Sequence, residues 1–311
     1  MTQPRGGGDA PPGDLPGLVA AELAVPVDPR VTAMAAAIAA QYGTAARAML
    51  FYGSCLRAAA GEGGLDGQML DFYLIVSDYE AAYGKGWLAR ANRLVPPNVF
   101  PFAHDGLAAK YAVLSEADLA RECGTTARSV SVWARFAQPA RLVWTRDAGA
   151  AARTAASVAQ AAVTLFRLTL PVAEGPPEPL AVWRCGFALT YGAELRAERN
   201  DRSGGIVDAD PARYDRFGRA ALAAIAQGGA ALASRQIMTR RWRAMQRHGK
   251  WLTAARLAKA TTTFAGGIDY LAWKINRHAD AGIVIRPWQR RHPILGAMTL
   301  LPKLMRKGAV R

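Results

Sequence analysis

Four short apolar runs in the first half of the chain place the firmest limit on its fold. They are rich in β-branched and aromatic residues, as strands are. The segments between them, and the alanine-rich residues 31–48 before the first run, favour helices instead. Because strands and helices alternate, we predict an α/β (α+β) domain over residues 31–146. The four expected strands are residues 49–53, 69–76, 106–115 and 140–144.

The rest of the chain divides by composition into two further parts and a tail. After residue 146 the chain is alanine-rich, and we predict a helical domain over residues 147–234. One helix there should end near Pro171, and another should begin near Pro179. Residues 235–311 are basic, and we expect them to form an amphipathic, membrane-contacting C-terminal segment. Residues 1–30 are rich in glycine and proline, and we expect a disordered tail.

Net charge is the most informative property of the composition. The chain carries 39 Lys and Arg against 24 Asp and Glu, a balance of +15. From residue 235 to the end there are 17 basic and 2 acidic residues, so the whole excess belongs to that segment. Its partner should be an anionic surface, either lipid headgroups or nucleic acid.

Other features of the composition argue against two classes of protein. The three cysteines lack metal-ligand spacing and are odd in number, which suits a reducing compartment better than a disulfide framework. The four histidines are scattered, so they form no zinc-binding pattern. No uncharged run of about 20 apolar residues occurs, which argues against a membrane-spanning helix.

A carboxylate interrupts the second apolar run. Asp71 lies within MLDFYLIV, where an unpaired charge would be costly, and Gly53-Ser54 ends the run before it. Glycine lets a triphosphate approach the backbone, and serine with nearby N–H groups can bind its oxygens. A strand aspartate can hold Mg²⁺, which neutralises charge on a leaving pyrophosphate. A structural ion pair is the alternative role for Asp71.

The strand does not itself supply a second metal ligand. DNA polymerase β-type nucleotidyltransferases, which begin with the same order of parts, place two carboxylates at alternate strand positions, so that both point to one face. Here the residue two after Asp71 is Tyr73. A second carboxylate would come from Asp78 at the end of the strand, or from Glu116 or Asp118.

Several motifs taken in order resemble a more specific family. They are YGSCLR, MLDFYLIVSDYEAAYGKGWLARANRL, KYAVLS, ARFAQPARLV and LTYGAELR…GGIVDADPARYDRF, within about residues 45–225. Together they resemble the mitochondrial-type phosphatidate cytidylyltransferases, the peripheral CDP-diacylglycerol synthases of cardiolipin synthesis. A single strand aspartate in a Met-Leu-Asp-Phe setting is usual in that family.

The resemblance implies roles for five residues near the strands. Gly53 and Ser54 would cradle the triphosphate of CTP, Asp71 would hold Mg²⁺, and Lys110 of KYAVLS would contact phosphate. Arg135 of ARFAQP matches an arginine in a Gly-Arg-Leu-Gln-Lys-Pro pattern. An ordinary surface lysine and a surface salt bridge are the alternatives for Lys110 and Arg135.

A second group of implied site residues lies on an expected helix. Tyr191, Glu194 and Arg196 match a Tyr-x-x-x-x-Arg pattern with an acidic residue between its ends. The alternative is a buried polar network within the helical domain.

The end of the chain resembles an interfacial membrane segment. Ile268, Leu271, Ala272 and Ile275 follow helical spacing, and residues 286–307 interleave Trp, Leu and Met with Arg and Lys. Apolar anchors beside cations suit an anionic membrane surface, so we predict that residues 266–311 contact one. A packed helix with a solvated basic face and a nucleic-acid-binding segment are the alternatives.

The resulting hypothesis is a Mg²⁺-dependent phosphatidate cytidylyltransferase, which converts CTP and phosphatidate to CDP-diacylglycerol and pyrophosphate. It would feed phosphatidylglycerol and cardiolipin synthesis from the cytoplasmic face of a bacterial inner membrane, as a peripheral protein. One alternative is a non-catalytic nucleic-acid- or membrane-binding protein on a decayed nucleotidyltransferase fold. The other is a nucleotidyltransferase with a different acceptor.

Overall fold

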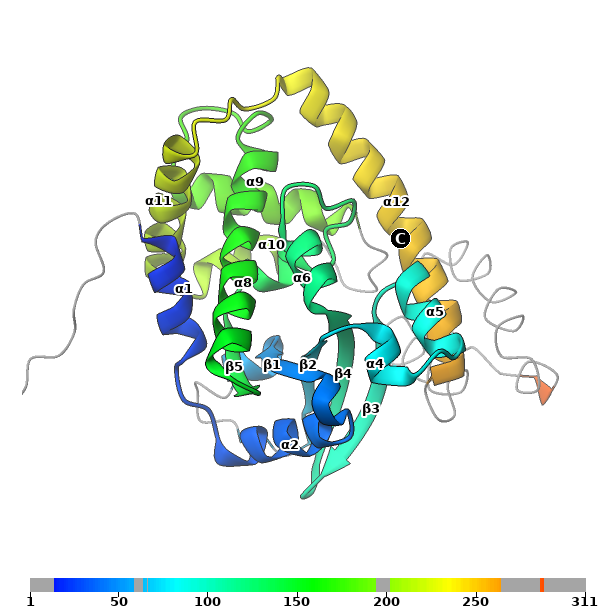
Figure 1. Ribbon diagram of the computed structural model, residues 1–311. Helices are drawn as coiled ribbons and strands as arrows, with labels where there is room; N and C mark the ends of the chain where they lie inside the picture. The colour runs from blue at the N-terminus through cyan, green and yellow to red at the C-terminus, as the bar shows by residue number, and fades with distance from the viewer. Residues whose placement is uncertain (1–13, 59–63, 66, 194–201, 264–285, 288–311) are drawn as a thin grey trace, which may run out of the picture.

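The computed structural model describes residues 14–58, 64–65, 67–193, 202–263 and 286–287. Within them the fold is mixed α/β, as the sequence predicts, with helices on both faces of a five-stranded mixed sheet (Figure 1). The strands are β1 (Ala46–Tyr52), β2 (Met69–Val76), β3 (Asn98–His104), β4 (Leu107–Ser115) and β5 (Ala140–Thr145).

The strands pair in the order β3-β4-β2-β1-β5. β2 and β4 run parallel, and the other three pairings are antiparallel. The four expected strands are all present, but the sequence analysis missed β3, which contains Pro101. Proline is tolerated there because β3 lies at an edge of the sheet, where one side of the strand donates no ladder hydrogen bond.

One face of the sheet is covered by helices from the first third of the chain. On α2 (Pro29–Ala40), Val31, Met34 and Ile38 follow i, i+3, i+7 spacing and are buried in one cluster with the β2 residue Leu74. The expected helix over residues 31–48 ends early, because β1 begins at Ala46 and strand pairing overrides alanine's helix propensity. The same part of the chain holds η1 (Gly43–Ala45), α3 (Ser54–Ala58), α4 (Tyr79–Tyr83) and α5 (Trp87–Leu94).

The other face is covered by a larger group of helices, most of them from the second half of the chain. The 22-residue helix α8 buries Leu165 and Phe166, and the Phe166 ring contacts the Trp183 ring edge-on, with 4.9 Å between ring centroids. The helices are α1 (Leu15–Leu23), α6 (Glu116–Cys123), α7 (Trp133–Phe136), α8 (Ala148–Thr169), α9 (Pro179–Tyr191), α10 (Arg202–Asp208) and α11 (Pro211–Gln227).

Helix α1 lies within the segment expected to be a disordered tail, so that expectation does not hold for residues 15–23. Leu15, Val19 and Leu23 follow i, i+4, i+8 spacing and are all buried. The proline-rich start of the chain obscures this stripe in the sequence. Asp14 caps the helix by accepting a hydrogen bond from the Gly17 backbone N–H at 2.9 Å.

A buried ion pair attaches α1 to the helical part of the chain. The Arg213 guanidinium on α11 donates two hydrogen bonds to the Glu22 carboxylate, at 2.5 and 2.9 Å. The Arg213 side chain is 4% exposed, and its guanidinium also lies 4.3 Å from the centre of the Phe217 ring. The pair therefore joins residues 191 positions apart in the sequence.

The last described helix, α12 (Arg235–Thr263), connects the helical part to the sheet (Figure 1). Its first half buries Met238, Trp242 and Met245, and the Trp242 indole donates a 2.8 Å hydrogen bond to the Leu168 carbonyl. Its second half contacts β3. No helix in the described ranges has both the length and the apolar character needed to cross a membrane.

We predict that Glu22→Ala lowers the free energy of unfolding by about 3–5 kcal/mol, because it leaves the Arg213 charge buried without a carboxylate. Chemical denaturation measures this change. The matched control is Asp215→Ala, which breaks a solvent-screened pair with Arg219 and should lower stability far less. Equal losses for the two variants would show that the buried pair has no special role.

A cationic pocket beside Asp71

Strand register brings three polar side chains into one row across the sheet. Tyr52 of β1 is the antiparallel partner of Asp71 on β2, and Asp71 is the parallel partner of Lys110 on β4. Tyr73 lies two residues along β2 and therefore on the same face. The position that carries a second carboxylate in the nucleotidyltransferase pattern is thus a tyrosine beside Asp71.

Asp71 and Lys110 form an ion pair. The Lys110 Nζ lies 3.0 Å from Asp71 Oδ1, and the two side chains are 32% and 17% exposed. Asp71 Oδ1 is buried and accepts no well-aligned hydrogen bond from the described residues, so Lys110 is its charge partner only. A carboxylate in this state retains lone pairs for a further ligand.

Gly53 is the turn that brings β1 against Asp71. Its φ of +98° is one that glycine adopts without penalty, and a Cβ atom there would lie 2.9 Å from Asp71 Oδ2. The short helix α3 begins at the next residue, Ser54, which is exposed. The structure therefore brings Gly53 and Asp71 into contact, as the resemblance implies.

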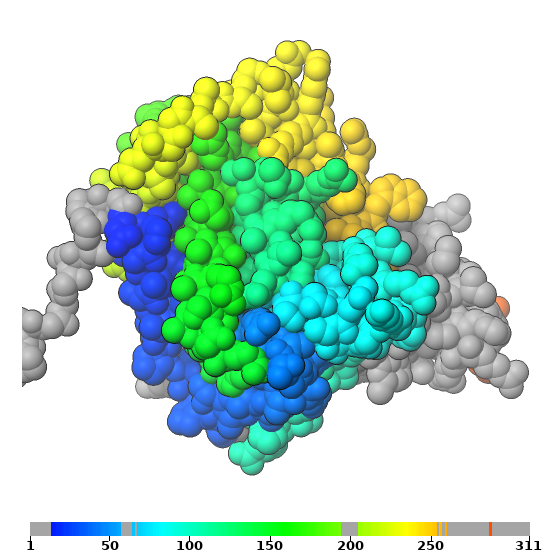
Figure 2. Space-filling model, in the orientation of Figure 1, coloured from blue at the N-terminus to red at the C-terminus, as the bar shows by residue number. Residues whose placement is uncertain are grey.

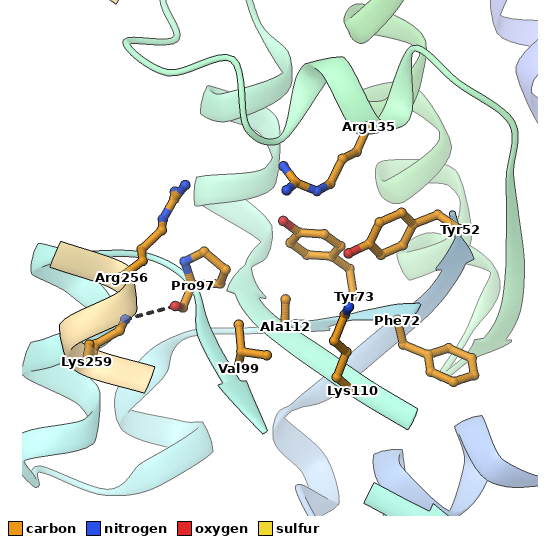
Figure 3. Close-up of a pocket in the computed structure, with 10 residues that line it drawn as sticks. All are labelled: Tyr52, Phe72, Tyr73, Pro97, Val99, Lys110, Ala112, Arg135, Arg256 and Lys259. Atoms are coloured by element: carbon orange, nitrogen blue, oxygen red, sulfur yellow. Dashed lines mark hydrogen bonds between the residues drawn. The ribbon is translucent and has the colours of Figure 1, made fainter. Parts of the chain in front are cut away.

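A cavity of about 170 Å³ lies beside this row of side chains. Figure 3 shows Tyr52 and Tyr73 entering it from the sheet, Arg135 from α7, and Arg256 and Lys259 from α12 on the opposite side. Asp71 does not line the cavity itself, but its ion-pair partner Lys110 does. The lining residues are Tyr52, Phe72, Tyr73, Pro97, Val99, Lys110, Ala112, Arg135, Arg256 and Lys259.

The charge of the cavity lining is one-sided. Lys110, Arg135, Arg256 and Lys259 all line it, and no carboxylate does within the described part of the chain. Four cations around so small a space favour a polyanionic ligand, and arginine and lysine are the side chains that bind phosphate oxygens. A volume of this size is below the roughly 300–1,000 Å³ of whole small-molecule sites. The cavity therefore fits the phosphate groups of a ligand and not an entire nucleotide.

Two of the four cations come from a helix that sequence reasoning did not include in the site. Arg256 donates to the Pro96 carbonyl at 2.7 Å and to Ser131 Oγ at 2.6 Å. Lys259 donates to the Pro97 carbonyl at 2.9 Å. These bonds fix the C-terminal part of α12 against the turn before β3. The only signal in the sequence was the basic composition that begins at residue 235.

Burial shifts the pKa values of two groups in the cavity. Burial, and then the nearby Arg256 charge, lower the pKa of Lys259 to about 7. Burial raises the pKa of Tyr52 well above its usual value, and the neighbouring Tyr73 and Asp71 add to the effect. Tyr52 is thus a neutral phenol, whereas Lys259 changes charge near neutral pH.

The carboxylates considered as a second metal ligand lie elsewhere. Asp78 follows the far end of β2, and the strand rise places Val76 about 17 Å from Asp71. Its carboxylate caps α4 by accepting from the Ala81 N–H at 2.8 Å, and this bond lowers its pKa. The structure does not bring Asp78 to Asp71. Glu116 pairs with Arg153, and Asp118 accepts a hydrogen bond from Tyr79.

The second group of expected site residues is described only in part. Tyr191 ends α9 and does not line the cavity. Glu194 and Arg196 lie outside the described residues. The helix end is nevertheless close to α12, because a Cβ on Gly249 would lie 2.0 Å from the Ala193 carbonyl oxygen.

The described residues fit a metal ion that takes one protein ligand. Nowhere in those residues do three or more His, Cys, Asp or Glu side chains gather into a cage. Mg²⁺, however, commonly binds through one or two carboxylates and completes its shell with phosphate oxygens and water. Asp71 Oδ1, buried without a hydrogen bond, is the oxygen that suits this arrangement.

No protein-family model matches the chain, and a search of curated proteins finds no similar sequence. The chemistry of this pocket is therefore the basis for assigning a function.

We predict that Gly53→Ala disturbs Asp71 as well as the turn. The new methyl group would clash with Asp71 Oδ2. The positive φ would add a separate backbone strain of about 1–3 kcal/mol, because alanine, unlike glycine, rarely adopts it. The control is Gly106→Ala, where φ is +73° but no atom lies within 4 Å of the added Cβ. Tripolyphosphate binding should fall in Gly53→Ala and stay at the wild-type value in Gly106→Ala. Equal binding by both variants would contradict the role of the turn.

We predict that Lys259 makes polyanion binding pH-dependent. Its amine is charged below about pH 7 and neutral above it, so tripolyphosphate affinity should fall about tenfold from about pH 6 to about pH 8. The ligand becomes more negative over this range, which acts in the opposite direction. Titration calorimetry on wild type and Lys259→Met separates the two effects. The variant should bind more weakly at the lower pH and lose the decrease, and an unchanged decrease would contradict the assignment.

Proposed function

We propose that the chain is a nucleotidyltransferase that acts on CTP and phosphatidate, forming CDP-diacylglycerol and pyrophosphate. The observation that carries the proposal is the Asp71–Lys110 pair at the edge of a cavity lined by three further cations. Gly53 in contact with Asp71, the motif order and the mixed sheet support the same reaction. Together these features suit a transfer between two phosphate groups.

The reaction needs charge stabilisation more than acid–base chemistry. A phosphate oxygen of phosphatidate attacks the α-phosphorus of CTP, and the bond from that phosphorus to the pyrophosphate oxygen breaks. The leaving electron pair goes to pyrophosphate, and the attacking oxygen is already ionised, so no general base is required. Lys110, Arg135 and Arg256 hold the phosphate oxygens in place and stabilise their charge.

A bound Mg²⁺ would neutralise charge developing on the pyrophosphate. In this proposal Asp71 holds the ion, together with phosphate oxygens and water. Lys110 both pairs with Asp71 and lines the cavity, so its amine can move from the carboxylate to a phosphate oxygen when the ligand binds. Tyr52 contributes a neutral hydroxyl group that adds no negative charge near the phosphates.

The acceptor lipid lies in a bilayer, so the proposed enzyme works at a membrane surface. The described helices include none able to span one, which is consistent with a peripheral protein. We propose that it works on the cytoplasmic face of a bacterial inner membrane and that residues 266–311 contact anionic lipid there. Those residues lie almost wholly outside the described part of the chain.

A second candidate function follows from the other roles of the carboxylates considered as a second metal ligand: Asp78 caps α4, Glu116 pairs with Arg153, and Asp118 accepts a hydrogen bond from Tyr79. A fold that had lost catalysis would keep the cationic pocket and bind polyanions without turnover. Such a protein would bind tripolyphosphate and release no pyrophosphate from any nucleotide.

The decisive experiment compares two carboxylate-to-amide variants, one on β2 and one at the N-cap of α4, which follows it. Pyrophosphate release is measured for each nucleoside triphosphate with Mg²⁺, with and without phosphatidate vesicles. We expect release with CTP and phosphatidate only, a loss of at least about 100-fold in Asp71→Asn, and near wild-type rates in Asp78→Asn. Asp78 is a suitable control because asparagine preserves a helix cap.

The other outcomes distinguish the alternatives. Release with a different nucleotide or acceptor would keep the reaction class and reject this substrate pair. Pyrophosphate release that survives Asp71→Asn would show that the active site lies away from this cavity. An absence of release by a folded, tripolyphosphate-binding protein would support the non-catalytic candidate.

A further inference from the structure

The outer face of α12 has an arrangement of charges that the pocket does not explain. Arg240, Arg243, Arg247 and Lys250 follow i, i+3, i+7, i+10 spacing, and all four are exposed. This spacing places them on one side of a helix. Within the described ranges none of them has a carboxylate within ion-pair distance, and residues 235–263 contain no Asp or Glu.

An apolar stripe runs beside these cations. Ile237, Ala244 and Trp251 recur every seven residues, so they share a side of the helix adjoining the cations. Ile237 is 59% exposed and Trp251 is 79% exposed, whereas Met238, Trp242 and Met245 on the opposite side are buried. Exposed large apolar side chains at both ends of a cationic stripe need a partner that offers charge and hydrocarbon together.

The cationic surface continues onto a neighbouring loop. A hollow of about 360 Å³ is lined by Arg241 and His248 of α12, together with Arg128 from the segment between α6 and α7. Ala244 of the apolar stripe also lines it, so the hollow lies along the edge of the stripe. Figure 2 shows the α12 segment, yellow to orange, as an outer ridge along one edge of the molecule.

We infer that the outer face of α12, from Ile237 to Trp251, docks on an anionic lipid bilayer. The cations would contact headgroup phosphates, while Ile237 and Trp251 would insert at the level of the headgroups and upper chains. A bilayer is favoured over RNA because isoleucine and tryptophan bracket the cations, and nucleic acid offers no hydrocarbon for isoleucine. This face is separate from residues 266–311, and its docking does not depend on any reaction in the pocket.

Docking in this orientation would bring the cavity close to the lipid. Arg256 follows Trp251 by five residues, which is about 7.5 Å along a helix, and Arg256 lines the cavity. Five residues also turn the helix by about 140°, so a membrane-bound α12 would separate the phosphate pocket from the headgroups by about one helix diameter, roughly 10–12 Å. This consequence rests on the proposed function, whereas the docking itself does not.

The test uses the full chain and vesicles of phosphatidylglycerol mixed with phosphatidylcholine, with pure phosphatidylcholine vesicles for comparison. Each cation near an anionic surface contributes about a fivefold effect, so Arg243→Gln/Arg247→Gln should partition about 30-fold more weakly. The matched control is Arg216→Gln/Arg219→Gln, two exposed arginines on one helix, α11, which should partition within about twofold of wild type. Both pairs are on the surface, and circular dichroism checks that the variants are folded.

A second measurement locates Trp251 itself. Brominated phosphatidylglycerol should quench part of the tryptophan fluorescence of wild type, and Trp251→Phe should lose that part. Asp71→Asn should bind the vesicles as wild type does, which separates a failure of docking from a failure of catalysis.

Three results would overturn the inference. In the first, Arg243→Gln/Arg247→Gln partitions as tightly as wild type, which would leave another segment as the sole lipid contact. In the second, lipid quenching of Trp251 is absent. In the third, the double variant loses RNA binding but keeps vesicle binding, which would assign the face to nucleic acid.

Discussion

The parallel pairing of β2 with β4 is the constraint on which the site depends. It places Asp71 directly beside Lys110, and the adjoining antiparallel pairing places Tyr52 on the other side of Asp71. A shift of one residue in either strand would turn the shifted side chain to the opposite face of the sheet. The hydrophobic surroundings prevent such a shift, because Phe72 and Leu74 are buried on one face and Tyr73 on the other. Packing of apolar side chains therefore fixes the position of the charged pair.

Much of the sheet follows from the sequence for this same reason. The run MLDFYLIV predicts β2 with its observed bounds, since apolar side chains on both faces allow few other structures. β3 was missed because it is an edge strand whose proline and polar ends weaken the pattern. Residues 46–48 were expected to be helical because alanine propensity is local, whereas membership in β1 is decided by pairing with distant strands.

The site residues expected from the sequence and found at or beside the cavity lie on the sheet or its strand ends, apart from Arg135 on α7. Gly53, Asp71 and Lys110, which the resemblance implies as site residues, belong to strands or strand ends, and the structure places Asp71 against both of the others. Arg256 and Lys259 lie about 150 residues beyond Lys110, and no local pattern connects them to it. Their place in the cavity depends on the packing of α12 against the turn before β3, which is a tertiary property. Asp78 shows the reverse error, because nearness in sequence suggested a shared site that an extended strand prevents.

Helix α12 explains why the unbalanced charge of the chain does not simply face solvent. Its inner side carries Met238, Trp242 and Met245 into the core, and near its C-terminal end Arg256 and Lys259 enter the cavity. Burying these cations is unfavourable, because burial and then repulsion from Arg256 disfavour the charged form of Lys259 and lower its pKa. A polyanion that enters the cavity relieves this repulsion, and its affinity includes that relief. The same absence of acidic residues leaves the exposed cations on the outer side of α12 without an acidic neighbour on that helix. One helix sequence thus supplies cations both to the cavity and to the outer surface.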